Sequence, residues 1–166
     1  MFTVKEATLD DLAHVAPLYE AYLTFYEVDY SEKNPLQYLQ QRLGNKESVI
    51  YFVVDEQGQY VGFTQLYPLF CSLEMNRTWL LYDLFVAESA RQHGVAQLLL
   101  DRADQLAKET QASFIMLSTA VDNLKAQNLY ERNHYEKDTE FFTYLKHVNA
   151  KHLFLAFHCS GGQRFY

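Results

Sequence analysis

The chain is poor in the residues that build disulfide frameworks and metal sites. Its 166 residues include two cysteines, Cys71 and Cys159, and these do not form a C-x-x-C pair. We therefore expect two reduced thiols rather than a disulfide or a metal pair. The histidines His147, His152 and His158 follow one another at spacings of five and six, which fit no usual zinc pattern. The sequence therefore predicts no metal site.

Long apolar runs and positive charge are also scarce. No apolar stretch reaches the roughly 18 residues that a membrane-spanning helix needs, and residues 1–6 lack the pattern of an export signal. The 21 acidic residues outnumber the 14 Lys and Arg residues, which gives a net charge of -7. We therefore expect a cytoplasmic protein with no membrane or nucleic-acid partner and a preference for a cationic small molecule.

Aromatic and other apolar residues are plentiful and predict one α/β domain without repeats. The hydrophobic fraction is 49% and the aromatic fraction 16%, enough for one core in 166 residues. The expected strands are 2–6, 48–54, 60–67, 77–86, 114–119 and 141–146, with a hairpin turn at 55–58 and a loop around 68–76. The expected helices start near Thr8, Asn34, Gly94, and Asp122 or Asn123. Pro17 should kink or divide the first helix. Strands 77–86 and 114–119 flank a helix, so they should be parallel.

A strand, a glycine turn and a helix follow one another between Leu81 and Leu100. The turn has the sequence Arg91-Gln92-His93-Gly94-Val95-Ala96. Gly94 permits close approach of the backbone to a ligand, and the N–H groups and dipole of a helix start favour an anion. The sequence therefore predicts a cradle for a pyrophosphate, made of backbone groups.

A second strand-helix unit follows at residues 114–135, where Asp122 or Asn123 is expected to cap the helix. The pattern N-x-x-A-x-x-L-Y-E-x-x-x-Y is formed by Asn123, Ala126, Leu129, Tyr130, Glu131 and Tyr135. This string and the R-x-x-G-x-A of the cradle together resemble the acetyl-coenzyme A (acetyl-CoA) site of the GCN5-related N-acetyltransferases (GNAT). The family commonly has glycine before the aromatic residue after this helix, whereas here His134 precedes Tyr135. Histidine tolerates a positive φ better than a branched residue but less well than glycine.

The resemblance implies a fold, a cofactor and a set of binding residues. The implied fold is α/β, a mixed central sheet with a splayed parallel strand pair and flanking helices over residues 1–146. Residues 147–166 would be a C-terminal extension that adds or exchanges a strand. Family members commonly dimerise, so a homodimer is expected. The implied acetyl-CoA-binding residues are Leu84, Phe85, Val86, Arg91, Gln92, His93, Gly94, Val95, Ala96, Asn123, Ala126 and Tyr130.

Acetyl transfer to an amine needs a group that accepts a proton from the amine and one that protonates the departing thiolate. The resemblance assigns the proton donor to Tyr130, for which a purely packing role is the alternative. In the polyamine acetyltransferases that the strand resembles, a carboxylate precedes the conserved aspartate, but here that position is Tyr82. Asp83 is the nearest replacement base, against a role in capping backbone groups. Further candidates for the base are Glu27, Asp29 and Glu74. Strand alternation places Tyr82 and Asp83 on opposite faces, so at most one should face the cleft.

The segment 22–32 would cover the amine side of the cleft. Its interleaved carboxylates and tyrosines suit a di- or polyamine, although an acidic solvated loop is the simpler alternative. The expected substrate-binding residues are Tyr26, Glu27, Asp29 and Tyr82. Residues 66–86 also resemble the branch with thialysine, polyamine and histone-like acetylating enzymes.

The sequence favours an N-acetyltransferase that moves the acetyl group of acetyl-CoA to a small cationic amine. A protein-lysine acetyltransferase is the alternative in the same class. A non-catalytic acetyl-CoA sensor is the alternative of another class, because the carboxylate expected at Tyr82 is missing. A Rossmann dehydrogenase is disfavoured, since the chain lacks G-x-G-x-x-G.

Overall fold

The computed structural model describes residues 1–148 of the chain. Its residues form two compact units, Met1–Leu117 and the part from Ser118 onward. Cys159 and most of the C-terminal extension, with the strand expected in it, lie outside the described residues, so the boundary at 146 stays a prediction. None of the described helices is both long and apolar enough to cross a membrane.

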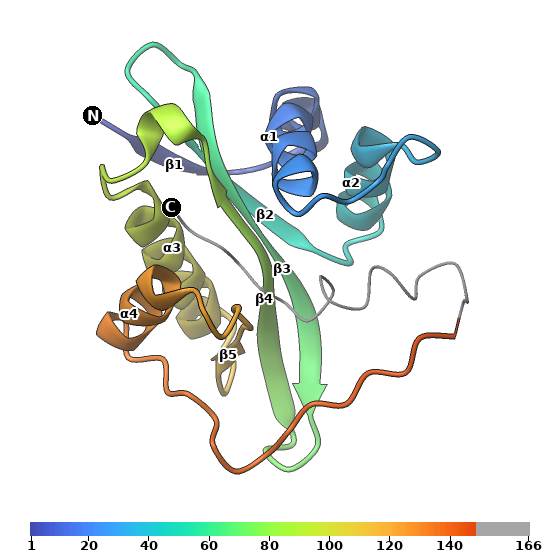
Figure 1. Ribbon diagram of the computed structural model, residues 1–166, viewed down its shortest axis with the longest axis vertical. Coiled ribbons are helices and arrows are strands. Elements are labelled where there is room, and N and C mark those ends of the chain that lie inside the picture. Colours follow the sequence, from blue (N-terminus) through green and yellow to red (C-terminus); the bar gives the residue numbers. More distant parts are fainter. Residues whose placement is uncertain (149–166) are drawn as a thin grey trace. The chain divides into compact units, whose positions relative to one another are not determined.

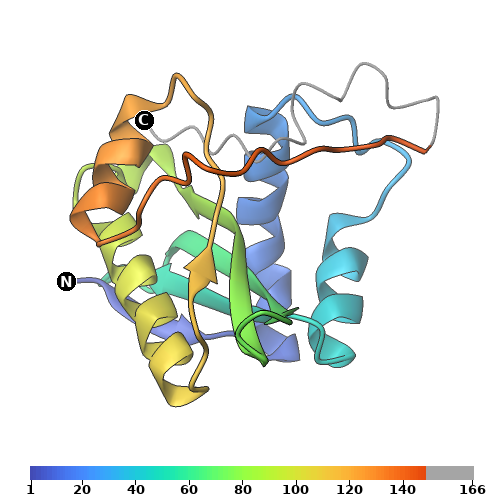
Figure 2. The same cartoon turned by 90° about the horizontal axis from the view of Figure 1, so that it is seen from below.

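The first unit is a five-stranded mixed sheet flanked by helices, which confirms the predicted fold class (Figure 1). Its elements are β1 (Thr3–Glu6), η1 (Leu9–Asp11), α1 (Leu12–Phe25), α2 (Pro35–Gly44), β2 (Val49–Val54), β3 (Tyr60–Cys71), β4 (Asn76–Val86), η2 (Glu88–Ala90), α3 (Val95–Glu109) and β5 (Ile115–Met116). The strands lie in the order β1-β2-β3-β4-β5. All neighbouring strands are antiparallel except β4 and β5, which are parallel as predicted. Figure 2 shows β5 beside β4 at the edge of the sheet.

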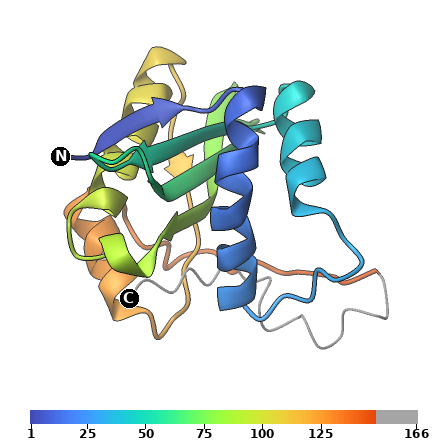
Figure 3. The same ribbon diagram turned by 90° about the horizontal axis from the view of Figure 1, so that it is seen from above.

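Helices cover both faces of this sheet. Helices α1 and α2 lie side by side on one face, and α3 covers the other (Figures 1 and 3). The core under α1 contains Leu12, Val15 and Phe63, none of which is exposed to solvent. Because the sheet is buried on both faces, its central strands carry few polar side chains, and those that are present are informative.

Local sequence signals set several element boundaries as predicted. The Asn34 side chain accepts a hydrogen bond from the Gln37 N–H and caps α2, with Pro35 in its first turn. Gly58 has a φ of 75° in the turn between β2 and β3, a conformation that favours glycine. Thr8 and Asp11 form a capping interaction at the helix start expected near Thr8, although the chain first makes the short 3₁₀ turn η1.

Helix α1 runs through Pro17 without division, because burial of its apolar face offsets the one hydrogen bond that proline removes, and a kink at Pro17 stays a prediction. Three other expectations about the elements are wrong. Strand β3 extends to Cys71, so most of the expected loop at 68–76 belongs to the β3–β4 hairpin. Strand β5 contains two residues rather than six. Residues 141–146 form no strand, because their β-favouring side chains have no partner strand among the described residues.

Candidate functional site

The predicted cradle is present between β4 and α3. Helix α3 begins at Val95, and Gly94 precedes it in the left-handed region with a φ of 81°. A Cβ atom built on Gly94 would meet no atom within 4 Å, so this face of the turn is open. Gln92 also has a positive φ, of 63°, which tightens the turn. The open, glycine-capped start of a long helix fits an anionic group held by backbone N–H groups.

Side chains and backbone groups of the cradle stabilise the turn through local contacts. Arg91 Nε donates a hydrogen bond of 3.0 Å to the Val86 carbonyl, and its guanidinium lies 5.9 Å from the Phe85 ring. His93 Nδ1 lies 2.6 Å from the Arg91 carbonyl oxygen. These contacts tie the turn to the end of β4. They fit the prediction that the backbone, rather than a row of side chains, contacts the phosphates.

The parallel pair that leads to the cradle is paired over only two rungs. Trp79 pairs with Ile115 and Leu80 with Met116, after which β4 continues to Val86. Within residues 1–148, no strand pairs with the β5-facing side of Leu84, Phe85 and Val86. The pair is therefore splayed, as predicted, and leaves backbone groups of β4 available on that side.

A β-bulge in β4 places Tyr82 and Asp83 on the same face of the sheet. Gln65 of β3 pairs with Asp83, but the next residue, Leu66, pairs with Leu81, so Tyr82 is the extra residue. The Tyr82 ring lies 5.6 Å from the Tyr67 ring, and Gln65 contacts the Asp83 side chain. Gln65 and Tyr67 share a face because they are two positions apart on one strand. The expectation that Tyr82 and Asp83 point to opposite faces is therefore wrong.

Asp83 is a buried carboxyl group held by two polar side chains. It is 4% exposed, Gln65 Nε2 donates a hydrogen bond of 2.9 Å to Oδ2, and the Tyr22 hydroxyl also bonds to the carboxylate. Burial raises the pKa of Asp83 to about 6, against the lowering effect of these two bonds. The described residues include no ion-pair partner for Asp83. The carboxylate is therefore a buried negative charge that no cation of the described residues neutralises.

Tyrosines from four elements surround this carboxylate, and we call them the tyrosine cluster. They are Tyr19, Tyr22 and Tyr26 of α1 and its C-terminal end, Tyr38 of α2, Tyr67 of β3 and Tyr82 of β4. The Tyr38 and Tyr67 hydroxyls lie 2.7 Å apart. Burial first, and then the Asp83 charge, raise the pKa of Tyr19, Tyr22 and Tyr67 above the usual phenol value, so these hydroxyls stay protonated.

The sequence predicted Tyr26 and Tyr82 at the site and placed Tyr22 in the segment that covers it, but it did not indicate Tyr19, Tyr38, Tyr67 or Gln65. Gln65 lies within one of the expected strands, 60–67. Gln65 is nevertheless fully buried, and its Oε1 has no hydrogen-bond partner in the part of the chain that the structure describes. An amide in the middle of a strand that is buried on both faces is the signal that would have indicated a polar site.

The loop after α1 carries the predicted acidic residues at the surface. Glu27 is exposed and has a φ of 55°, and Asp29 is also exposed. Asp29 Oδ1 accepts a hydrogen bond of 3.0 Å from the Ser31 N–H, and this bond lowers the pKa of Asp29. Asp29 therefore has a local role in the turn, and a role for either residue in substrate binding stays a prediction.

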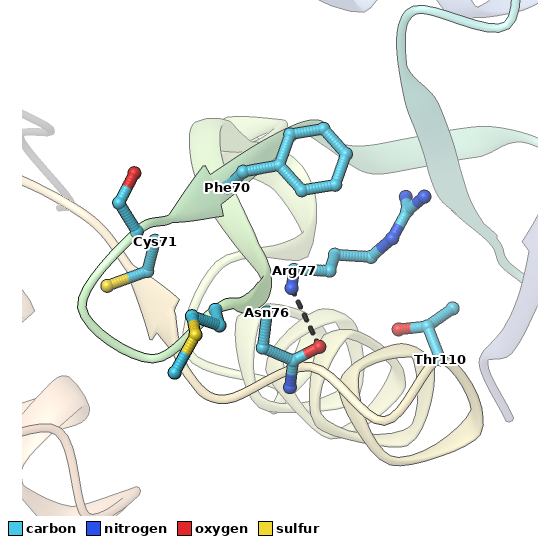
Figure 4. Close-up of a pocket in the computed structure, with 7 residues that line it drawn as sticks. Phe70, Cys71, Asn76, Arg77 and Thr110 are labelled. Carbon is cyan, nitrogen blue, oxygen red and sulfur yellow. Dashed lines mark hydrogen bonds between the residues drawn. The ribbon is translucent and has the colours of Figure 1, made fainter.

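Glu74 is placed away from the bulge. It lies in the turn of the β3–β4 hairpin, seven or more residues along the strand from Asp83, which corresponds to roughly 23 Å at about 3.3 Å per residue. The same end of the hairpin has an open pocket of about 450 Å³ lined by residues that include Phe70, Cys71, Arg77 and Thr110 (Figure 4). Neither Glu74 nor this pocket belongs to the Asp83 site.

The second unit contains the other predicted motif. Helix α4 (Leu124–Arg132) begins after Asn123, whose side chain accepts a hydrogen bond of 3.2 Å from the Ala126 N–H, as predicted. Tyr130 is 3% exposed, and its ring lies 5.8 Å from that of Tyr135. His134 has a φ of 64°, so histidine occupies the conformation for which the family commonly uses glycine.

Comparisons with known proteins agree with these two motifs. The model of the Acetyltransferase (GNAT) family matches residues 15–135. The chain is 41% identical over 148 residues to an uncharacterized N-acetyltransferase of Bacillus subtilis (strain 168), YhfO, covering 89% of this chain and 99% of that protein. A crystal structure of a probable acetyltransferase is 42% identical with a TM-score of 0.83, covering 89% of this chain and 98% of that one. A predicted acetyltransferase of Clostridium acetobutylicum, solved with acetyl-CoA, shares the fold with a TM-score of 0.71 at 16% identity, covering 87% of this chain and 96% of that one.

The matched range contains most of α1, the bulge, the cradle and α4, and GNAT enzymes are acetyl-CoA-dependent acyltransferases. The chain therefore belongs to the GNAT family of acetyltransferases.

Proposed function

We propose that the protein transfers the acetyl group of acetyl-CoA to the primary amine of a small cationic acceptor, by direct attack with both substrates bound. The observation that carries the acceptor class is Asp83, a buried carboxylate without a cationic partner among the described residues, surrounded by tyrosines. An isolated buried charge is unfavourable unless it is paired. An incoming ammonium group supplies that pairing, and tyrosine rings attract cations through their faces.

The cofactor side of the proposal depends on the cradle and on the splayed end of β4. Backbone groups of Arg91–Ala96 would hold the pyrophosphate of acetyl-CoA, and the available edge of Leu84–Val86 would bind the pantetheine arm. When bound, acetyl-CoA supplies the thioester. An N–H group near Phe85 or Val86 would polarise the thioester oxygen, and alignment of the two substrates would contribute most of the rate gain.

The base assigned to this reaction is Asp83. A primary amine arrives protonated, with a pKa near 10.4, and must lose a proton before attack. A carboxyl group with a pKa of about 6 is ionised at neutral pH and is a better proton acceptor than an ordinary aspartate. Tyr82 is 46% exposed on the same face and would pass the proton inward or contact the amine. A carboxylate at position 82 is therefore not required.

The proposed proton donor is tested by replacing Tyr130 with phenylalanine. The substitution keeps the ring and removes the acidic hydroxyl, so we expect kcat to fall by roughly 100-fold while acetyl-CoA affinity stays unchanged. Tyr135→Phe is the matched control, because the two rings are neighbours and only Tyr130 is assigned the proton. Steady-state rates and calorimetric cofactor binding give both quantities. Equal kcat values for Tyr130→Phe and the parent protein would leave Tyr130 with a packing role.

The function itself is tested by coenzyme A release from acetyl-CoA over a panel of acceptors. The panel contains di- and polyamines, amino acids, aminoglycosides and lysine peptides, and mass spectrometry identifies the acetylated product. We expect the highest kcat/KM for a small acceptor with two or more amines, and a KM that rises with salt, because charge attraction is screened. A preference for lysine peptides would favour a protein acetyltransferase. Cofactor binding without any product would favour a sensor.

A further inference from the structure

The amide group that holds Asp83 has one polar atom with a partner and one without among the described residues, and the proposed function does not use this difference. Gln65 is fully buried and donates through Nε2 to Asp83 Oδ2, while its Oε1 is buried and has no partner within residues 1–148. A buried amide oxygen without a hydrogen bond is unfavourable, so such atoms are rare unless another state of the protein satisfies them. The unsatisfied atom belongs to the same amide group that holds the carboxylate.

The two protonation states of Asp83 need opposite partners. An ionised carboxylate only accepts hydrogen bonds, so the N–H of Gln65 is the correct partner. A protonated carboxyl group carries an O–H that must donate, and it then faces an N–H that also donates. A half-turn of the amide exchanges Nε2 for Oε1, and the new O–H then donates to Oε1.

We propose that Gln65 is the positioning residue for the proton acceptor, and that its amide turns over when Asp83 takes the proton of the amine. The step is a proton transfer without redox chemistry: the N–H bond of the ammonium breaks, an O–H bond forms on Asp83 Oδ2, and the amine nitrogen keeps the electron pair. Gln65 holds the carboxylate beforehand and accepts its O–H afterwards. The amine as the source of the proton rests on the proposed function, whereas the half-turn of the Gln65 amide does not.

The surroundings of Asp83 offer few alternatives for this role. Tyr19 and Tyr22 face it from α1, Tyr67 from β3 and Tyr82 from β4, and Tyr38 of α2 reaches it through Tyr67. The Thr64 hydroxyl is already donated to the Asp83 carbonyl, at 2.7 Å. The tyrosine hydroxyls can both donate and accept, whereas Gln65 Oε1 is a pure acceptor beside Asp83 that the contacts within residues 1–148 leave unused.

The direct test is a pH titration of the parent protein by NMR, with ¹³C and ¹⁵N labels. We expect the Asp83 carboxyl signal and the Gln65 side-chain amide signals to change with one midpoint, near the raised pKa of Asp83. The Gln65 amide signals should move further than those of the exposed Gln59. Gln65 signals that do not respond while Asp83 titrates would overturn the proposal. This measurement needs no amine substrate, so it separates the inference from the proposed function.

Two variants test the role in the reaction. Gln65→Met keeps the length of the side chain and removes the donor, so the Asp83 midpoint and the acid limb of kcat/KM should both move up by about one pH unit. Gln65→Glu, which offers two acceptors to a protonated Asp83, should move both further. Thr78→Val is the control, because Thr78 lies in the same sheet and is also buried with an unpartnered oxygen. Unchanged midpoints in the Gln65 variants, with only lower stability, would reduce Gln65 to a structural role. Activity on no amine at all would refute the proposed function, and the NMR titration would still decide the inference.

Discussion

Replacing Gly94 with valine is expected to weaken acetyl-CoA binding by about 100-fold. The φ of 81° at Gly94 is unfavourable for a branched residue, and the added side chain would occupy the open face of the turn where phosphates must approach. Loss of one or two charge-assisted hydrogen bonds, each worth about 1.5–3 kcal/mol, gives this magnitude. Isothermal titration calorimetry on the folded variant measures it.

Gly58 provides a matched control for this experiment. It has a similar φ of 75°, and a Cβ atom there would also meet nothing within 4 Å, but it lies in the β2–β3 turn. Gly58→Val should therefore carry a similar backbone strain and bind acetyl-CoA like the parent protein. If Gly94→Val keeps the parent affinity, or if both variants lose it equally, the cofactor site has been assigned to the wrong turn.

Replacing Asp83 with asparagine is expected to lower kcat/KM by 100-fold or more and to stabilise the protein above pH 6. The activity falls because asparagine cannot accept the proton of the amine. The effect on stability follows from the raised pKa of this acid, from 3.8 to about 6. The folded state binds the proton more tightly than the unfolded state, so stability is lost as pH rises from about 4 to 6. The ionised group then costs up to about 3 kcal/mol.

Urea unfolding at pH 4.5 and pH 8 measures the stability effect. The difference in unfolding free energy between Asp83→Asn and the parent should grow toward pH 8, and other titrating groups cancel in this comparison. Asp104→Asn, on the exposed surface of α3, is the control for both measurements. A variant with parent activity would remove Asp83 from the reaction, and a pH-independent difference would mean that its carboxyl group is not perturbed.

The parts of the site that follow from local sequence were predictable. The strand, turn and helix of the cradle, the caps at Asn34 and Asn123 and the turn at Gly58 each depend on a few adjacent residues. Residues this close in sequence find their conformation largely through backbone geometry and short hydrogen bonds. The positive φ of His134, by contrast, is implied by the resemblance to the family, which commonly has glycine at this turn.

The parts that depend on pairing were not predictable. Whether residues 141–146 form a strand depends on a partner strand, and the face of Tyr82 depends on the register between β3 and β4. Gln65 meets Asp83 across that register, 18 residues away in sequence. Period-two alternation assumes a regular ladder, and one extra residue on one strand invalidates it from that point on.

The bulge also divides β4 into two segments of opposite phase. Trp79 lies before the bulge and donates a hydrogen bond to Thr110 at the end of α3. Phe85 lies after the bulge and packs against Tyr22 of α1, on the other face, although both residues have odd numbers. Deletion of position 82 would make Leu81 and Asp83 adjacent, opposite the adjacent Leu66 and Gln65, so the ladder would become regular and both segments would keep their faces. Position 82 is therefore an extra residue that places a side chain beside Asp83 without a change in either layer of the core.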